Sequence, residues 1–383
     1  MQQVRELLFQ LIRCEICGDS PDPALFGSLS EEEWISVLRF AKKHETAHLV
    51  SDAALRFFST DNSTLTATFK RYKYVAVSHN VRLTACLKKC SELLTAARVP
   101  FIFLKGSVLR NYYPETWMRT SADIDVLIPE DRFEETTRIL SAAEGFRYRN
   151  MTPHDVSFSM AEGIVLELHH SLIEAGRIGK AEQLLNDIWS YTETDDGIRY
   201  RLTDEMFYYY HLAHMAKHIE NGGCGIRPFI DLWLLNHKLP ENPARSELLK
   251  EGGLDRFAYA VNTLSEYWFG DGSADENTLI LERFILEGGV FGTKENAAGV
   301  KSIKLHGKAG YMLQKIWMPY PYLCCQYPEL KGRRALQPVY EVRRWMRIVF
   351  RGNIGFAKQE LELTKKASAQ LPQTKKMWRY LGF

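Results

Sequence analysis

Apolar residues are spaced in different ways in different parts of the chain. Over residues 1–95 they recur every three to four positions, which is typical of amphipathic helices. Residues 28–33 offer a helix cap followed by acidic residues, and the apolar positions after it are Trp34, Val37, Leu38 and Ala41. A long helix is expected over about 65–97, because apolar faces continue until Pro100.

Short apolar runs separated by turns replace this spacing between residues 96 and 200. Runs of this length with alternating polar residues are typical of strands. We expect helices near 107–113 and 129–143. Four to five strands of mixed direction are predicted, at 101–105, 123–128, 146–149, 156–160 and 164–169.

Helical spacing returns from residue 201 onward. A helix is expected from Thr203 to Ile219, the glycine-rich residues 222–225 break it, and another helix follows over 227–237. The three regions predict an α+β protein. A small mixed sheet (96–200) would be flanked by an N-terminal helical segment (1–95) and a larger C-terminal helical domain with a basic end (201–383).

Two carboxylates lie two residues apart in the predicted strand at 123–128. Asp123 and Asp125 therefore project from the same face, while their apolar neighbours belong to the core. Two adjacent like charges are costly unless a cation lies between them. If the strand at 164–169 is adjacent, Glu167 completes a three-carboxylate cluster suited to two Mg²⁺ ions. The alternative is that all three are ordinary surface acids.

A glycine turn precedes the acid pair. Gly106 and Ser107 follow an apolar run and open a helix, so their backbone amides and the hydroxyl could hold phosphate. The alternative is an ordinary strand-to-helix turn capped by Ser107. Lys105 and Arg119 could neutralise phosphate charge or could equally be exposed cations. His169 shares the face of Glu167 and could bind substrate or carboxylate, or have a structural role.

These residues together resemble the DNA polymerase beta-like nucleotidyltransferase superfamily, in its branch of uncharacterised bacterial nucleotidyltransferases. The resemblance covers about residues 96–175. It rests on Leu104-Lys105-Gly106, Arg119, Asp123-Ile124-Asp125, Gly145-Phe146, His154 and Glu167-Leu168-His169. Two departures are the long gap between Gly106 and Asp123 and the lysine directly before the glycine.

The resemblance implies a metal-dependent transferase. It would move a nucleoside monophosphate (NMP) from a nucleoside triphosphate (NTP, ATP among them) to a hydroxyl-type acceptor, releasing pyrophosphate. Asp123, Asp125 and Glu167 would be the catalytic residues and would bind Mg²⁺. The nucleotide would contact Lys105, Gly106, Ser107, Arg119, His169 and Lys217.

The acceptor is open to more than one interpretation. A small molecule is favoured. A protein acceptor, as in toxin–antitoxin or regulatory transferases, and a degenerate nucleotide-binding module without turnover are the alternatives. Nucleic-acid polymerisation is disfavoured, because no helix-hairpin-helix signature is apparent.

The helix after Thr203 contains a cluster of histidines around Lys217. His214 and His218 are spaced like metal ligands, but no third ligand is evident. We instead expect this helix to line the cleft, with Lys217 or His218 near the nucleotide. Arg227 and Asp231, four residues apart on the next helix, are interpreted as a structural ion pair.

Charge is distributed unevenly. The formal net charge is +2, yet residues 301–383 contain 17 basic and 4 acidic residues. This basic end is expected to dock on the acidic body, with an anionic partner such as nucleic acid or a membrane as the alternative. Residues 335–351 form an amphipathic helix whose apolar face is expected to pack on the helical body rather than on a membrane.

Neither the N-terminus nor the cysteines indicate export. The first residues lack the apolar core of a signal peptide and no apolar run approaches the ~20 residues of a membrane span, so a cytoplasmic location is expected. Seven cysteines do not suggest a disulfide framework. Cys14 and Cys17 have the spacing of half a zinc site, but reduced thiols are favoured because no second such pair follows.

Overall fold

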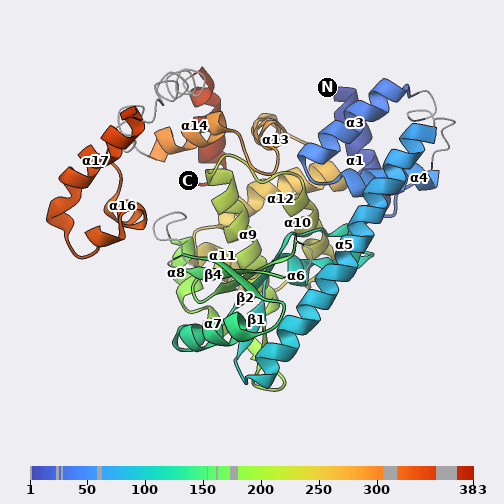
Figure 1. The fold of residues 1–383 in the computed structure, drawn as a ribbon. Coiled ribbons are helices and arrows are strands. Elements are labelled where there is room, and N and C mark those ends of the chain that lie inside the picture. Colours follow the sequence, from blue (N-terminus) through green and yellow to red (C-terminus); the bar gives the residue numbers. More distant parts are fainter. Residues whose placement is uncertain are drawn as a thin grey trace.

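The chain folds around one mixed sheet and many helices, which confirms the α+β prediction (Figure 1). The computed structural model describes residues 2–22, 26, 29–57, 63–152, 154–160, 163–172, 180–304, 317–350 and 369–383. Ser28, in the predicted cap, and Arg351, in the predicted basic helix, lie outside these residues.

The N-terminal helices form as the apolar spacing predicts. They are α1 (Gln2–Ile16), α3 (Glu31–Lys43), α4 (Ala47–Phe57) and α5 (Ser63–Ala96). Ser30 and Glu33 form a reciprocal capping box at the start of α3, which satisfies two backbone amides there. The helix then buries Trp34, Val37, Leu38 and Ala41.

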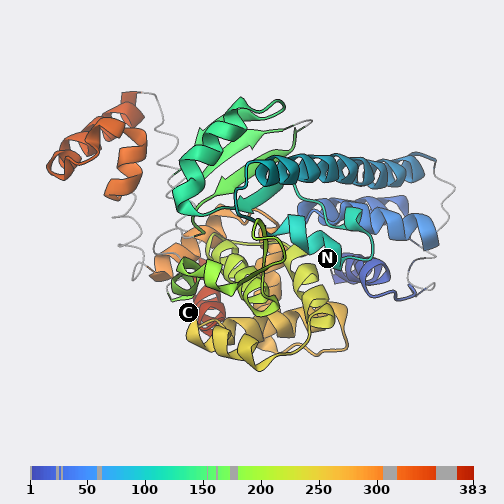
Figure 2. The same ribbon diagram turned by 90° about the horizontal axis from the view of Figure 1, so that it is seen from below.

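Helix α5 joins two hydrophobic cores. Near its start Leu65 and Phe69 belong to the main core with the other helices, while Leu83 and Leu94 pack into a second core against the sheet. Figure 2 shows this long helix extending from the N-terminal helices to the sheet. Because one rigid helix contributes to both cores, it fixes the N-terminal helices relative to the strands.

The sheet has seven strands in the described part of the chain, in the order β3-β4-β5-β2-β1-β7-β6. Pairs β2–β5 and β1–β7 are parallel and the remaining pairs are antiparallel, so the direction is mixed as predicted. The strands are β1 (Phe101–Phe103), β2 (Asp123–Leu127), β3 (Arg147–Met151), β4 (Asp155–Ser159), β5 (Val165–His169), β6 (Thr192–Thr194) and β7 (Arg199–Leu202).

The prediction of four to five strands is wrong, because the hairpin β6–β7 adds two strands beyond β1. Its turn contains Gly197 in the left-handed region, at φ +69°. The two strands are short and mostly polar, with sequences Thr-Glu-Thr and Arg-Tyr-Arg-Leu. They therefore lack an apolar run of the kind that marks β1, β2 and β5.

The two faces of the sheet have different coverings. Ile124 and Val126 of β2 belong to the core formed with α5 and α7 (Phe133–Ala142), the helix that follows Pro129 as predicted. The alternate residues Asp123 and Asp125 point to the opposite face. That face is turned toward the C-terminal helices, so the carboxylates face a second layer of structure rather than open solvent.

The C-terminal region is helical, as predicted. A first helix α8 (Ala181–Asn186) precedes the hairpin. It is followed by α9 (Asp204–Glu220), α10 (Arg227–Lys238), α11 (Pro243–Glu251), α12 (Asp255–Phe269), α13 (Glu276–Gly288) and α14 (Lys294–Lys304). Thr203 caps α9 by accepting a hydrogen bond from the Met206 amide. None of the helices described in the structure is both long and apolar enough to cross a membrane.

One part of the basic end docks on the body. The helix over residues 369–380 places Met377, Trp378 and Leu381 in or beside the main core. Lys376 Nζ lies 2.7 Å from a carboxylate oxygen of Glu276 on α13. This segment of the basic end therefore packs on the body, mainly through apolar side chains.

The other part, α16 (Tyr320–Gln326) and α17 (Gln337–Phe350), forms a small core of its own at one side of the body (Figures 1 and 2). Glu341 and Arg344 of α17 are buried there, whereas Val339 and Val342 are 61% and 58% exposed. The expectation that the apolar face of this helix packs on the helical body is therefore wrong for these residues. The reason is that the face of α17 that is buried carries the polar residues Glu341 and Arg344.

Candidate active site

Strand pairing brings the three acidic residues together. In the parallel pair β2–β5, Asp125 is the register partner of Glu167, and Asp123 is the partner of Val165. Residues opposite each other in a pair share a face, and so do residues two apart in a strand. The predicted adjacency of the Glu167 strand to the Asp strand is thus confirmed.

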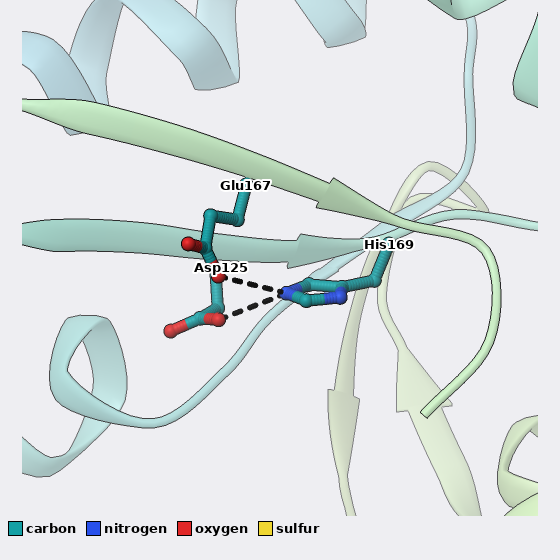
Figure 3. Close-up of side chains that lie close together, drawn as sticks. All are labelled: Asp125, Glu167 and His169. Atoms are coloured by element: carbon teal, nitrogen blue, oxygen red, sulfur yellow. Dashed lines mark hydrogen bonds and ion pairs between the residues drawn. The ribbon is translucent and has the colours of Figure 1, made fainter. Parts of the chain in front are cut away.

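His169 completes a compact cluster with two of these acids (Figure 3). Its Nε2 lies 2.9 Å from Asp125 Oδ1 and 3.6 Å from Glu167 Oε2. One donor atom from each of the three residues lies within 4.8 Å of the others, which is close enough for them to share one ion. It is the one group of three potential metal ligands among the described residues.

Lys105 is held against the same carboxylate. Its Nζ lies 2.6 Å from Asp125 Oδ1. Lys105 also adopts φ +46° and ψ −126°, in a region that side-chain-bearing residues rarely occupy. Such a conformation costs roughly 1–3 kcal/mol and persists where surrounding contacts over-determine it. Here those contacts are the ion pair and the hydrogen bond from Leu109 N to Lys105 O.

The cluster contains carboxyl groups with opposite pKa shifts. Burial opposes ionisation of Asp125, but Lys105 and His169 hold its pKa well below the usual range. Burial and the neighbouring Asp125 charge raise the pKa of Asp123, and the same two causes raise the pKa of Glu167. Excess negative charge in a poorly solvated place is the condition that favours binding of a cation.

Gly106 starts the short helix α6 (Gly106–Leu109) beside the acid strand. A Cβ added there would lie 2.8 Å from both Cβ and Oγ of Ser121, so glycine is required by close approach. The amide of Ser107 donates to Leu104 O, and the Ser107 hydroxyl is buried without a hydrogen-bond partner. Most amides of this turn are thus engaged internally, leaving side-chain cations as the main positive groups at the site.

Arg119 is buried and forms an ion pair with the helical layer. Its Nε lies 2.7 Å from Asp231 Oδ1 on α10, and its NH1 donates to Thr120 O. Arg227 instead pairs with Glu45. The prediction that Arg227 and Asp231 form an ion pair is therefore wrong. Each of these residues pairs with an oppositely charged residue from another part of the chain.

A cavity of about 460 Å³ lies between the carboxylates and the helices α9 and α10. Its wall includes six of the predicted site residues, namely Lys105, Gly106, Arg119, Asp123, Asp125 and Lys217. The other three, Ser107, Glu167 and His169, lie outside the lining. The expectation that the histidine helix lines the cleft is confirmed, since His211, His214 and His218 are also on the wall.

The histidines of α9 bond to neighbours within the protein. His214 and His218 bring their Nε2 atoms to 3.2 Å from each other, and His211 Nε2 lies 3.0 Å from Pro228 O. Burial and the nearby Lys105 charge lower the pKa of His214 well below its ordinary value. Among the described residues, the one group of three potential metal ligands does not include these histidines.

Several residues of the cavity wall could not be identified from the sequence. Glu45 and Tyr210 have no motif that marks them, whereas Phe291 lies in a glycine-rich run, Gly288-Gly289-Val290-Phe291-Gly292. That run is a signal for a close backbone approach and could have drawn attention to the loop.

A family model described as "uncharacterised nucleotidyltransferase" matches residues 30–270, which is more than half of the chain. The chain belongs to this family. Comparisons with curated proteins and with solved structures found no match. The matched region contains the whole sheet, the acidic cluster and helices α9 and α10, so the nucleotidyltransferase family accounts for most of the cavity wall.

The acidic residues fit the divalent metal that nucleotidyltransferases typically use. Hard carboxylate oxygens are the ligands that Mg²⁺ prefers. Asp125 and Glu167 bring such oxygens close together, and Asp123 adds another from the same face. A cation on Asp125 would compete with Lys105, whose ammonium already balances that carboxylate.

Proposed function

We propose that this nucleotidyltransferase moves an NMP group from an NTP to a hydroxyl-type acceptor and releases pyrophosphate. The observation on which the proposal rests is the three-carboxylate face beside a cavity lined with cations, in a chain of this family. The cavity volume of about 460 Å³ falls in the range of small-molecule sites, which fits the NTP as its ligand.

Asp123, Asp125 and Glu167 would hold Mg²⁺, two ions in our proposal, which would neutralise charge on the reacting phosphate. Lys105, Arg119 and Lys217 would balance the triphosphate, and Gly106 would let its backbone approach closely. Ser107, with its unpaired buried hydroxyl, is a further proposed phosphate contact. His169 would orient Asp125 and Glu167 through its Nε2.

Glu167 is our candidate for the base. Its raised pKa favours accepting a proton. The acceptor hydroxyl would give its proton to Glu167 while its oxygen forms a bond to the α-phosphorus. The bond from that phosphorus to the bridging oxygen breaks, and pyrophosphate leaves with the electron pair. Because Glu167 is half-buried and outside the cavity lining, we propose that the acceptor approaches from the β5 side.

A reducing compartment suits the thiols. Cys14 and Cys17 are free, and burial raises the pKa of each thiol to about 11. Both are therefore neutral thiols rather than the thiolates that bind metal ions. These thiols support our proposal that the protein works in the cytoplasm.

Label transfer tests the proposed reaction. The protein is incubated with each NTP labelled at the α-phosphate, Mg²⁺ and a protein-free pool of small metabolites. We expect label in a new small product together with pyrophosphate. Asp123→Asn should lower the rate by roughly 100-fold or more, because a charge that stabilises the reacting phosphate is lost. Glu134→Gln, at an exposed position on α7, is the control and should match wild type.

Two results would go against this proposal. Equal pyrophosphate release by wild type and Asp123→Asn would exclude the carboxylates as the reacting site. Label found on protein but never on a small product would favour the protein-modifying alternative.

A further inference from the structure

Phe291 is an aromatic side chain on the cavity wall that is almost fully exposed. It is 87% exposed and follows Val290, which also lines the cavity. A phenylalanine leaves this much apolar surface in water only at a cost, so an exposed ring at a cavity suggests a ligand that covers it.

The loop that presents Phe291 is fixed by glycine packing. A Cβ on Gly292 would lie 2.6 Å from the Gly222 carbonyl carbon, and a Cβ on Gly223 would lie 2.9 Å from Gly292 Cα. Asn296 at the start of α14 donates to Gly222 O at 3.1 Å. The loop between α13 and α14 is thereby locked against the end of α9, and Figure 1 shows α14 beside that helix.

Helix α9 separates two chemically different ends of the cavity. Tyr210 lies near the acidic cluster, since Lys105 and Asp125 both act on its phenol electrostatically. Asn221 directly follows the other end of α9, next to the glycine loop. The stretch from Tyr210 to Asn221 rises roughly 16 Å along the helix axis, and this distance is longer than a ribose. The carboxylates and Lys105 therefore mark one end, and an aromatic ring marks the other.

We propose that Phe291 stacks on the nucleobase of the NTP whose phosphates lie at the carboxylate end. The inference rests on the proposed function and adds the base subsite to it. Every nucleobase offers a π-face, so this contact would strengthen binding without choosing among bases. Phe291 lies beyond residues 30–270, so the subsite is built by a part of this chain outside the family match.

Calorimetric titration with two probes tests the assignment. Each of the four NTPs and inorganic tripolyphosphate are titrated in Mg²⁺ into wild type, Phe291→Ala and Phe291→Trp. Loss of one aromatic stacking contact should weaken NTP binding roughly 5- to 150-fold. Tripolyphosphate should bind Phe291→Ala and wild type equally, and Phe291→Trp should keep NTP binding. Tyr74→Ala, which removes a 73% exposed ring on α5 away from the cavity, is the matched control.

The outcomes separate this inference from the proposed function. NTP binding that is the same in Phe291→Ala and wild type would overturn the stacking role. Equal weakening of NTP and tripolyphosphate would also overturn it, because the ring would then only shape the loop. If wild type binds neither probe, the proposed function itself fails, and the base subsite fails with it.

Discussion

Single side chains in the site depend on partners that are distant in sequence. His48 on α4 has its Nε2 2.7 Å from Met118 O, directly before Arg119. The neutral tautomer with a proton on Nε2 donates this hydrogen bond. Protonation would add a charge near Arg119 and Arg227, which both act to lower the pKa of His48. The uncharged form of one histidine thus supports the segment that leads into the acid strand.

This arrangement predicts a pH-dependent stability. Burial lowers the pKa of His48 to about 4, against roughly 6.5 when unfolded. The unfolded chain therefore binds this proton first as the pH falls. The contribution of His48 is present above about pH 6.5 and is lost as the pH falls toward 4, by about 3 kcal/mol at most. Urea unfolding at pH 7.5, 6.0 and 4.5 measures the loss.

His48→Gln is the informative variant, because its amide can still donate to Met118 O but does not titrate. It should lose less free energy of unfolding between pH 6.5 and 4.5 than wild type. His237→Gln, at an exposed position on α10, should follow wild type. Identical pH slopes for wild type and His48→Gln would contradict the assignment.

The sequence made some of these residues predictable and not others. Asp123, Asp125 and Glu167 could be grouped because strand periodicity fixes which side chains share a face. The contact between Lys105 and Asp125 could not be predicted, since it depends on a backbone φ of +46° that lysine rarely adopts. Phe291 could not be placed either, because its position depends on contacts between residues 222–225 and residues 288–292, which are far apart in the sequence.

Secondary-structure elements are tied together by buried charge. Arg119 before β2 bonds to Asp231 on α10, and Tyr113 OH donates to the same carboxylate at 2.7 Å. Burial disfavours ionisation of Asp231, but Arg119 more than offsets this and lowers its pKa. This link joins the segment before β2 to the helical layer, and both Arg119 and Asp231 line the cavity.

Breaking that link should be costly. Asp231→Asn leaves the buried Arg119 guanidinium without its carboxylate, and we expect a loss of roughly 3–5 kcal/mol in the free energy of unfolding. Glu193→Gln breaks the exposed Arg201–Glu193 pair of the β6–β7 hairpin and should cost less than ~1 kcal/mol. Urea unfolding of both variants checks the contrast. Equal, small losses would show that the Arg119–Asp231 pair does not join the layers.

Elements with a clear apolar period were predictable. Strands β1, β2, β4 and β5 and helices α5, α7, α9 and α10 follow the expected ranges closely, because burial selects their apolar positions. Strand β3 was also expected, although all five of its residues are exposed. The β6–β7 hairpin was not predictable, since its strands are short and polar. Helix α17 has an evident amphipathic pattern, yet the pattern alone does not determine which of its faces is buried.

At the scale of the whole molecule, the region outside the family match completes the cavity. Residues 30–270 supply the carboxylates, the cations and the histidine helix, while the loop before α14 adds Phe291. The helix over 369–380 packs on the main core beside α13. The charge composition suggested that the basic end docks on the body, but it did not separate this helix, which packs mainly through apolar side chains, from α17.

The central claim is that the acidic cluster binds an NTP together with Mg²⁺. Thermal unfolding tests it most directly, with each of the four NTPs, with and without Mg²⁺, for wild type and the double variant Asp123→Asn/Asp125→Asn. A ligand at about 100 times its Kd adds ~2.7 kcal/mol to the free energy of unfolding. We predict a rise in Tm with at least one NTP that requires Mg²⁺ and disappears in the folded double variant. No shift with any NTP, or an equal shift in the double variant, would contradict the claim.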